Sequence, residues 1–239
     1  MKKEWKAYFR KEEIILWCAS AGLILLAFIL FDRGNYLTVT ASLIGVTSLI
    51  FNAKGNPVGQ LLMVVFSLLY GVVSYSFAYY GEMITYLGMT MPMAVAAWIS
   101  WIKNPYEAGR SEVRVGHMKK CDVLVMSILT ILVTVVFYYV LAYFHTANRI
   151  PSTISVSTSF LAVYLTIKRS PYYAVAYAAN DIVLIILWSL ASVEEIRYLS
   201  VVVCFAAFFA NDIYGFVSWR RMEKWQNLAP DNTQETKRV

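Results

Sequence analysis

Two Asn-Asp pairs stand inside long apolar stretches of the sequence, Asn180-Asp181 and Asn211-Asp212. A carboxylate in apolar surroundings is costly, so an acidic residue there usually faces a bundle interior or a water-filled cavity. Counted at the helical rise, Asp181 lies roughly 15 Å past the start of its predicted helix, and Asp212 roughly 10 Å before the end of the next, antiparallel helix. We therefore expect the two carboxyl groups to approach one polar cluster. They would either line a functional cavity or form a helix–helix clasp in which protonation removes part of the charge.

Aromatic residues make up 15% of the chain, and many fall within the same apolar stretches. Stacking and cation–π attraction let aromatic side chains hold a planar ligand with delocalised or positive charge. Most such side chains serve packing, so only some are expected to bind a ligand. The candidates inside the stretches are Tyr70, Tyr86, Tyr173, Tyr177, Trp188 and Tyr214.

The sequence carries no recognisable catalytic or metal-binding motif. His117 and His145 stand apart from each other, and nucleophile-elbow, HExxH and P-loop patterns do not occur. Cys18, Cys121 and Cys204 are far apart and form no CxxC spacing, which argues against a disulfide framework or a zinc site. We expect a protein without catalytic residues, bound metal or cofactor.

The composition indicates that these residues belong to membrane-spanning helices. Of 239 residues, 59% are hydrophobic and 15% are charged, whereas a soluble domain has roughly 25% charged residues. A spanning helix needs about 17 to 25 mostly apolar residues. Eight stretches meet this requirement, at 14–31, 36–53, 58–80, 83–101, 123–144, 151–167, 172–190 and 198–219. The first follows a charged run, but its apolar stretch is long for a signal peptide, so we expect a retained helix.

The placement of positive charge predicts the orientation of the chain. If the eight stretches alternate sides, eighteen Lys and Arg residues lie on one side and three on the other. The positive-inside rule then places both termini in the cytoplasm of a multi-pass cell-membrane protein. The basic excess is thus a topology signal that also favours anionic lipid head groups, and we expect no nucleic-acid partner.

A basic turn followed by proline occurs twice, at 54–57 and at 168–171, with an offset of 114 residues. We predict an all-α polytopic membrane protein with one N-terminal helix and a 3+1+3 bundle of two parallel three-helix repeats. The expected parts are the cytoplasmic N-terminus with the extra helix (1–35), the first repeat (36–101), the cytoplasmic loop with the linker helix (102–150), the second repeat (151–222) and a cytoplasmic tail (223–239). Parallel repeats of this kind occur in transporters, which bind substrate near the membrane midplane.

A set of motifs lies between residues 36 and 222: Lys54-Gly55, Tyr70, Tyr80-Gly81-Glu82, Pro92, Trp98, Trp101, Lys168-Arg169, Trp188 and Asn211-x-Ile213-Tyr214-Gly215-x-x-x-Trp219. Together these residues resemble the PnuC family of nicotinamide riboside transporters. The resemblance implies a fold related to the SWEET sugar transporters. It also implies uptake of nicotinamide riboside by facilitated diffusion, with cytoplasmic phosphorylation by a separate kinase trapping the substrate.

The sequence departs from this family at positions that bear on the substrate. Where the family often has Trp-x-x-Trp-x-x-x-Asn, this chain has Ala174, Tyr177 and Asp181. Polar positions of the first repeat are occupied by Phe66, Tyr86 and Ala94. Nicotinamide riboside is therefore the leading substrate. Thiamine, riboflavin and deoxynucleosides are alternatives, because proteins that resemble PnuC carry them.

Nicotinamide riboside is a flat pyridinium cation that requires an aromatic face, a carboxylate and amide partners for its ribose. The predicted substrate-binding residues are Tyr70, Tyr86, Tyr177, Asn180, Asp181, Trp188, Asn211, Asp212 and Tyr214. Thiamine would fit the same chemistry, whereas riboflavin would gain less from Asp181. A non-transporting receptor or assembly component, docking through 102–121 and the tail, is the other class that stays open, and a homo-oligomer is possible.

Overall fold

A computed structural model describes residues 8–76, 79–107, 111–146 and 148–228. Eight helical spans in these residues are long and apolar enough to cross a membrane, which confirms the predicted number. Seven spans are single helices: α2 (Lys11–Phe31), α3 (Tyr36–Ala53), α4 (Pro57–Ser76), α7 (Lys120–Tyr143), α8 (Arg149–Ile167), α9 (Tyr173–Ser192) and α10 (Leu199–Leu228). The remaining span joins α5 (Tyr80–Thr85), a π-helical turn η1 (Tyr86–Thr90) and α6 (Met91–Lys103), and a short 3₁₀ turn η2 (Ile196–Tyr198) precedes α10.

Two predicted boundaries differ from the structure. The helix expected at 58–80 ends at Ser76, and Tyr80 begins the following span instead. The last helix continues past residue 222 to Leu228, so part of the predicted tail is helical. An ion pair between Arg220 and Glu223, one turn apart, supports this extension. Residues 1–7 and 229–239, at the two ends of the predicted terminal segments, lie outside the described residues.

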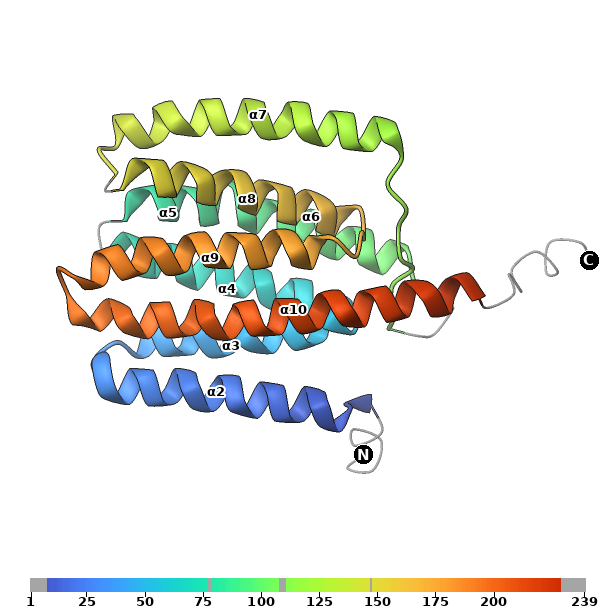
Figure 1. Cartoon of the computed structure of the whole chain (residues 1–239), viewed down its shortest axis with the longest axis horizontal. Helices are drawn as coiled ribbons and strands as arrows, with labels where there is room; N and C mark the ends of the chain where they lie inside the picture. Colours follow the sequence, from blue (N-terminus) through green and yellow to red (C-terminus); the bar gives the residue numbers. More distant parts are fainter. Residues whose placement is uncertain (1–7, 77–78, 108–110, 147, 229–239) are drawn as a thin grey trace, which may run out of the picture.

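Six helices pack in a closed circle, in the order α3, α4, α6, α8, α9 and α10, with α10 returning to α3. We refer to these helices as the six-helix bundle. Helix α2 packs outside it against α10 and α3, and α7 packs outside it against α8, as Figure 1 shows at the two edges of the molecule. These six helices follow one another round the circle in chain order, and α7 is left outside between α6 and α8. Superposition of the repeats stays a prediction.

The two Ser- and Thr-rich helices, α3 and α8, are inner helices of this bundle, with about half of their residues buried. Their hydroxyl groups donate to backbone carbonyls one turn earlier, as Ser42 does to Thr38 O at 2.8 Å and Thr166 does to Ala162 O at 2.8 Å. These bonds satisfy the polar groups without water. Low hydropathy in these spans therefore reflects protein surroundings rather than lipid surroundings.

Two buried tryptophans tie the end of each predicted repeat to the first helix of the other. The indole Nε1 of Trp101 donates to Thr166 O at 2.9 Å, and that of Trp219 donates to Asn52 O at 2.7 Å. The two acceptors are 114 positions apart, the same offset as the basic turns. The indole centroids lie 5.3 Å apart, so the two halves meet at this pair of tryptophans, which we name the aromatic floor.

A loop segment crosses this floor and joins both basic turns. In residues 111–116, which we name the strap, the backbone N–H of Val113 donates to Gly55 O at 3.0 Å and that of Gly116 donates to Arg169 O at 2.9 Å. Gly55 and Arg169 occupy equivalent positions and share a left-handed backbone, with φ of 63° and 57°. Val113 and Val115 are buried with both tryptophans. The strap therefore seals one end of the six-helix bundle.

Candidate functional site

Asp181 on α9 and Asp212 on α10 face each other inside the bundle. The two side chains are 3% and 4% exposed, and their carboxyl groups lie within hydrogen-bonding reach of each other. Oδ2 of Asp181 meets no hydrogen-bond partner among the described residues. Two buried carboxyl groups in contact cannot both carry an uncompensated negative charge, so the pair needs a shared proton or a nearby cation.

An aromatic cluster lies next to this carboxyl pair. Tyr70 on α4 is its centre, with its ring centroid 4.5 Å from that of Tyr86 and 6.3 Å from that of Trp188. Tyr86 lies within electrostatic reach of Asp181, which joins the cluster to the pair. Phe66, Tyr79, Phe205 and Phe208 extend the packing. The centre of the bundle thus combines acidic groups with aromatic faces.

The π-helical turn η1 sets the position of Tyr86. Pro92 stands at the start of α6 and lacks the N–H that would bond to the carbonyl four residues earlier. Just before it, the N–H of Met91 bonds to Tyr86 O, a spacing of five residues that defines a π-turn. The hydroxyl of Thr90 in the same turn meets no partner among the described residues. Proline therefore accounts for an irregular turn at the site that the sequence pattern did not predict.

Tyr177 connects the carboxyl pair to the aromatic floor. Its side chain lies close to that of Thr166 and within electrostatic reach of both Asp181 and Asp212. Its ring packs edge-on against Tyr173 at a centroid distance of 6.1 Å, and Tyr173 in turn contacts Trp219. Tyr177 thus lies on the strap side of the acidic pair, opposite the Tyr70 cluster.

Asn180 points away from the carboxyl pair toward α8. Its Oδ1 accepts hydrogen bonds from Ser155 at 3.3 Å, Thr158 at 2.8 Å and Ser159 at 3.1 Å. These three hydroxyls recur at a spacing of three and four residues, which places them on one helix face. In this conformation Asn180 fastens α9 to α8.

Asn211 and Tyr214 also face away from the pair, toward α2. Asn211 Nδ2 donates to Ser20 Oγ at 2.8 Å, and the Tyr214 hydroxyl donates to Glu13 Oε1 at 3.1 Å. Successive helical residues point about 100° apart, so a helix that turns Asp212 toward α9 turns Asn211 toward another neighbour. Asn211 and Asp212 were expected in one site because they are neighbours in the sequence, but the fold directs them toward different helices.

Glu82 is a buried acidic residue that the sequence analysis did not select. Its side chain in α5 is 1% exposed, and neither carboxyl oxygen meets a hydrogen-bond partner among the described residues. It lies within electrostatic reach of Tyr70, Tyr79 and Tyr86. Glu82 was not predicted as a binding residue because it falls between two predicted spans, although it belongs to the Tyr80-Gly81-Glu82 motif.

Comparison with known proteins identifies the family. The profile of the family described as "Nicotinamide mononucleotide transporter" matches residues 35–221, most of the chain. The chain belongs to this family. It is 24% identical over 240 residues to the nicotinamide riboside transporter PnuC of Neisseria mucosa, covering 93% of this chain and 90% of that protein. The resemblance found in the sequence is thereby confirmed, and the chain is a PnuC-type protein.

A solved structure described as the crystal structure of the vitamin B3 transporter PnuC shares this fold. It matches with a TM-score of 0.79 at 21% identity, over 91% of this chain and 94% of that chain. The comparison confirms an all-α polytopic membrane fold for this PnuC-type protein.

The departures from the PnuC pattern fall around the carboxyl pair. Ala174 is fully buried, and a Cβ at Gly215 would lie 3.7 Å from its methyl group, so α9 and α10 approach closely there. Phe66 fills part of the aromatic cluster, 5.9 Å from Tyr86 between ring centroids. Asp181 adds a carboxyl group where the PnuC pattern often has asparagine. Relative to the expected motif, this site therefore gains the carboxyl group of Asp181 and the ring of Phe66 and lacks a ring at Ala174.

Proposed function

We propose that the protein transports nicotinamide riboside across the cell membrane by facilitated diffusion. The observation that carries this proposal is the buried contact between Asp181 and Asp212 beside the Tyr70–Tyr86–Trp188 cluster. A pyridinium cation would supply the positive charge that this pair requires, while aromatic faces hold its planar ring. The name of the Neisseria mucosa relative supports the same substrate.

The charge of the site favours the riboside over the mononucleotide that appears in the family description. A phosphate group would bring additional negative charge beside Asp181, Asp212 and Glu82. Among the described residues, no lysine or arginine is buried in the bundle to balance it. Nicotinamide riboside, which carries one positive charge and no phosphate, avoids this repulsion.

Facilitated diffusion agrees with the charge of the substrate. An inside-negative membrane potential drives a cation inward by about 2.3 kcal/mol per 100 mV, so uptake needs no second ion. Phosphorylation by a separate cytoplasmic kinase would then trap the substrate, because the product carries the charge that the site disfavours. The eighteen-to-three division of basic residues supports cytoplasmic termini and, with them, a strap that faces the cytoplasm.

Purified protein in liposomes tests the proposal directly. We expect uptake of labelled nicotinamide riboside that exceeds uptake by protein-free liposomes and rises with an inside-negative potential. Nicotinamide mononucleotide should be excluded, and a kinase with ATP inside the liposomes should raise accumulation. Uptake of thiamine in preference to nicotinamide riboside would assign another vitamin, and binding without flux would indicate a receptor. A requirement for a proton or sodium gradient would contradict facilitated diffusion.

A further inference from the structure

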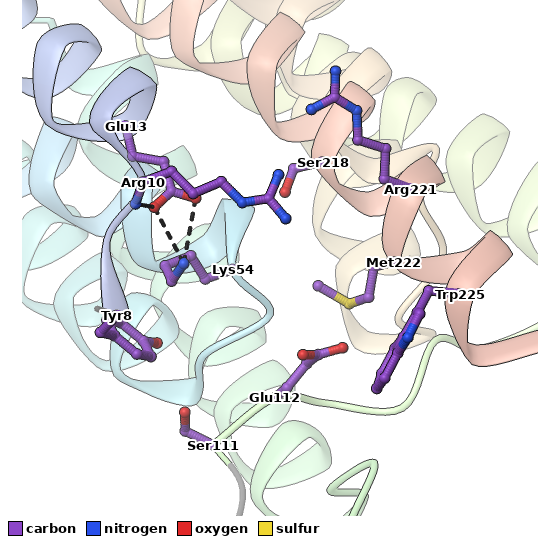
Figure 2. Close-up of a pocket in the computed structure, with 10 residues that line it drawn as sticks. All are labelled: Tyr8, Arg10, Glu13, Lys54, Ser111, Glu112, Ser218, Arg221, Met222 and Trp225. Atoms are coloured by element: carbon purple, nitrogen blue, oxygen red, sulfur yellow. Dashed lines mark hydrogen bonds and ion pairs between the residues drawn. The ribbon is translucent and has the colours of Figure 1, made fainter. Parts of the chain in front are cut away.

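A cavity of about 720 Å³ opens at the strap end of the molecule, apart from the central site. Its walls come from the start of α2, the turn after α3, the strap and the extension of α10, as Figure 2 shows. Its volume falls within the range of about 300 to 1,000 Å³ that is common for small-molecule sites. Four separate elements therefore border an open cavity that is large enough for a metabolite.

The charges around the cavity leave a positive excess. Glu13 is paired with Lys54 at 3.1 Å, and Glu112 accepts a hydrogen bond from Gln226 at 3.0 Å. Arg10 and Arg221 line the same cavity, and neither has a carboxylate partner in the part of the chain that the structure describes. Guanidinium groups bind phosphate oxygens well because their planar donors fit two oxygens at once.

Aromatic side chains complete the cavity. Trp225 stands on the α10 side and Tyr8 on the opposite side, near Lys54 (Figure 2). Trp225 is 46% exposed although it packs against Tyr106 at a centroid distance of 5.1 Å. An exposed indole that lines the same cavity as two arginines suits a ligand that has a planar ring as well as a phosphate.

We propose that this cavity is a second binding site, which takes a soluble phosphate ester bearing a planar ring, of the nucleoside monophosphate class. Arg10 and Arg221 bind the phosphate, and Trp225 contacts the ring. Because Ser111 and Glu112 of the strap line the cavity, a bound ligand connects the strap to α2 and α10. The proposal does not depend on which substrate the central site carries.

Binding of adenosine monophosphate to the purified full-length protein in uncharged detergent tests this site. We expect adenosine monophosphate to bind more tightly than either adenosine or inorganic phosphate. Arg221→Gln should weaken its binding about tenfold, because a charge-assisted hydrogen bond is lost. Arg220→Gln is the matched control, since Arg220 is paired with Glu223 and does not line the cavity. Trp225→Leu should reduce the advantage of adenosine monophosphate over inorganic phosphate.

A lipid head group offers the same phosphate chemistry, so the measurement is repeated in nanodiscs with and without phosphatidylglycerol. Binding of adenosine monophosphate in both supports the proposal. Retention of phosphatidylglycerol without binding of adenosine monophosphate overturns it, as does an equal loss in the Arg220 and Arg221 variants. Asp181→Asn should leave this binding unchanged, which separates the cavity from the central site.

Discussion

Asp181 and Asp212 lie in contact. The free-energy cost of burying both carboxyl groups depends on whether a proton or a cationic ligand lies between α9 and α10. If the pair is a structural clasp that shares a proton, the folded state depends on it. If it is a binding site, the empty protein bears a cost that a cationic ligand relieves. These two roles predict opposite changes in stability when one carboxyl group is removed.

Glu82 should behave in the same way as the aspartates. Replacement by Gln keeps the shape of the side chain and removes a buried carboxyl group without a partner among the described residues. We expect Glu82→Gln to keep or raise the melting temperature and to lower the initial rate of nicotinamide riboside uptake in liposomes. The exposed Glu194→Gln is a control at the same end of the bundle. A large drop in melting temperature with normal uptake would show that Glu82 has a structural role.

Tyr177 should contribute through its ring rather than its hydroxyl. Removal of the ring in Tyr177→Ala should weaken ligand binding by about 1 kcal/mol, a typical value for a stacking or cation–π contact. Tyr177→Phe keeps the ring and loses only the hydroxyl group, so its affinity should stay near that of the wild type. Isothermal titration with nicotinamide riboside measures both. Equal losses in the two variants would assign the effect to the hydroxyl.

At the scale of elements, the extra N-terminal helix α2 is held to the bundle by a polar contact. Glu13 is 2% exposed and bonds to both Lys54 and Tyr214. Loss of one member of a buried ion pair leaves the other charge uncompensated, which costs on the order of 3 kcal/mol. Glu13→Gln should therefore lower the thermal stability, and the exposed neighbour Glu12→Gln should not. Equal melting temperatures for the two variants would contradict this role of Glu13.

The strap should depend on the absence of a side chain at Gly116. A Cβ there would clash with the backbone oxygen of Lys168. We expect Gly116→Ala to lift the strap and to accelerate hydrogen exchange at the amides of Val113 and Gly116. Gly22→Ala, where nothing lies within 4 Å of an added Cβ, is the control. Unchanged exchange in Gly116→Ala would show that the strap is held by other contacts.

At the scale of the whole molecule, hydropathy and charge predicted the number of spans because lipid imposes the same requirement on every helix. The side of a helix that each polar residue faces was harder to predict. Asn211 is adjacent to Asp212 but bonds to α2, and Asn180 is adjacent to Asp181 but bonds to α8. The π-turn was not predicted because the mostly apolar run around Pro92 contains too few polar residues, Thr85 and Thr90 among them, to show where the helical phase changes.

The orientation of the molecule is tested by fusing a reporter at either of two positions, one at the C-terminus and one after α2. Because eighteen basic residues are predicted on one side, a reporter fused after Val239 should be active only in the cytoplasm. A reporter after Arg33 should give the opposite result, since that residue follows α2 on the other side. Activity outside the cell for the Val239 fusion would overturn the predicted topology. We also expect residues 58–101 and 172–219 to superpose as parallel repeats.

The most direct test of the central claim is the affinity of Asp181→Asn for nicotinamide riboside, measured with its melting temperature in detergent. Asp122→Asn serves as the control, because Asp122 lies on the peripheral helix α7 and pairs with Lys168 away from the site. We predict that Asp181→Asn loses about tenfold or more in affinity, as expected for a lost charged contact, while its melting temperature stays the same or rises. Unchanged affinity with a much lower melting temperature would contradict the account and assign Asp181 and Asp212 to a structural clasp.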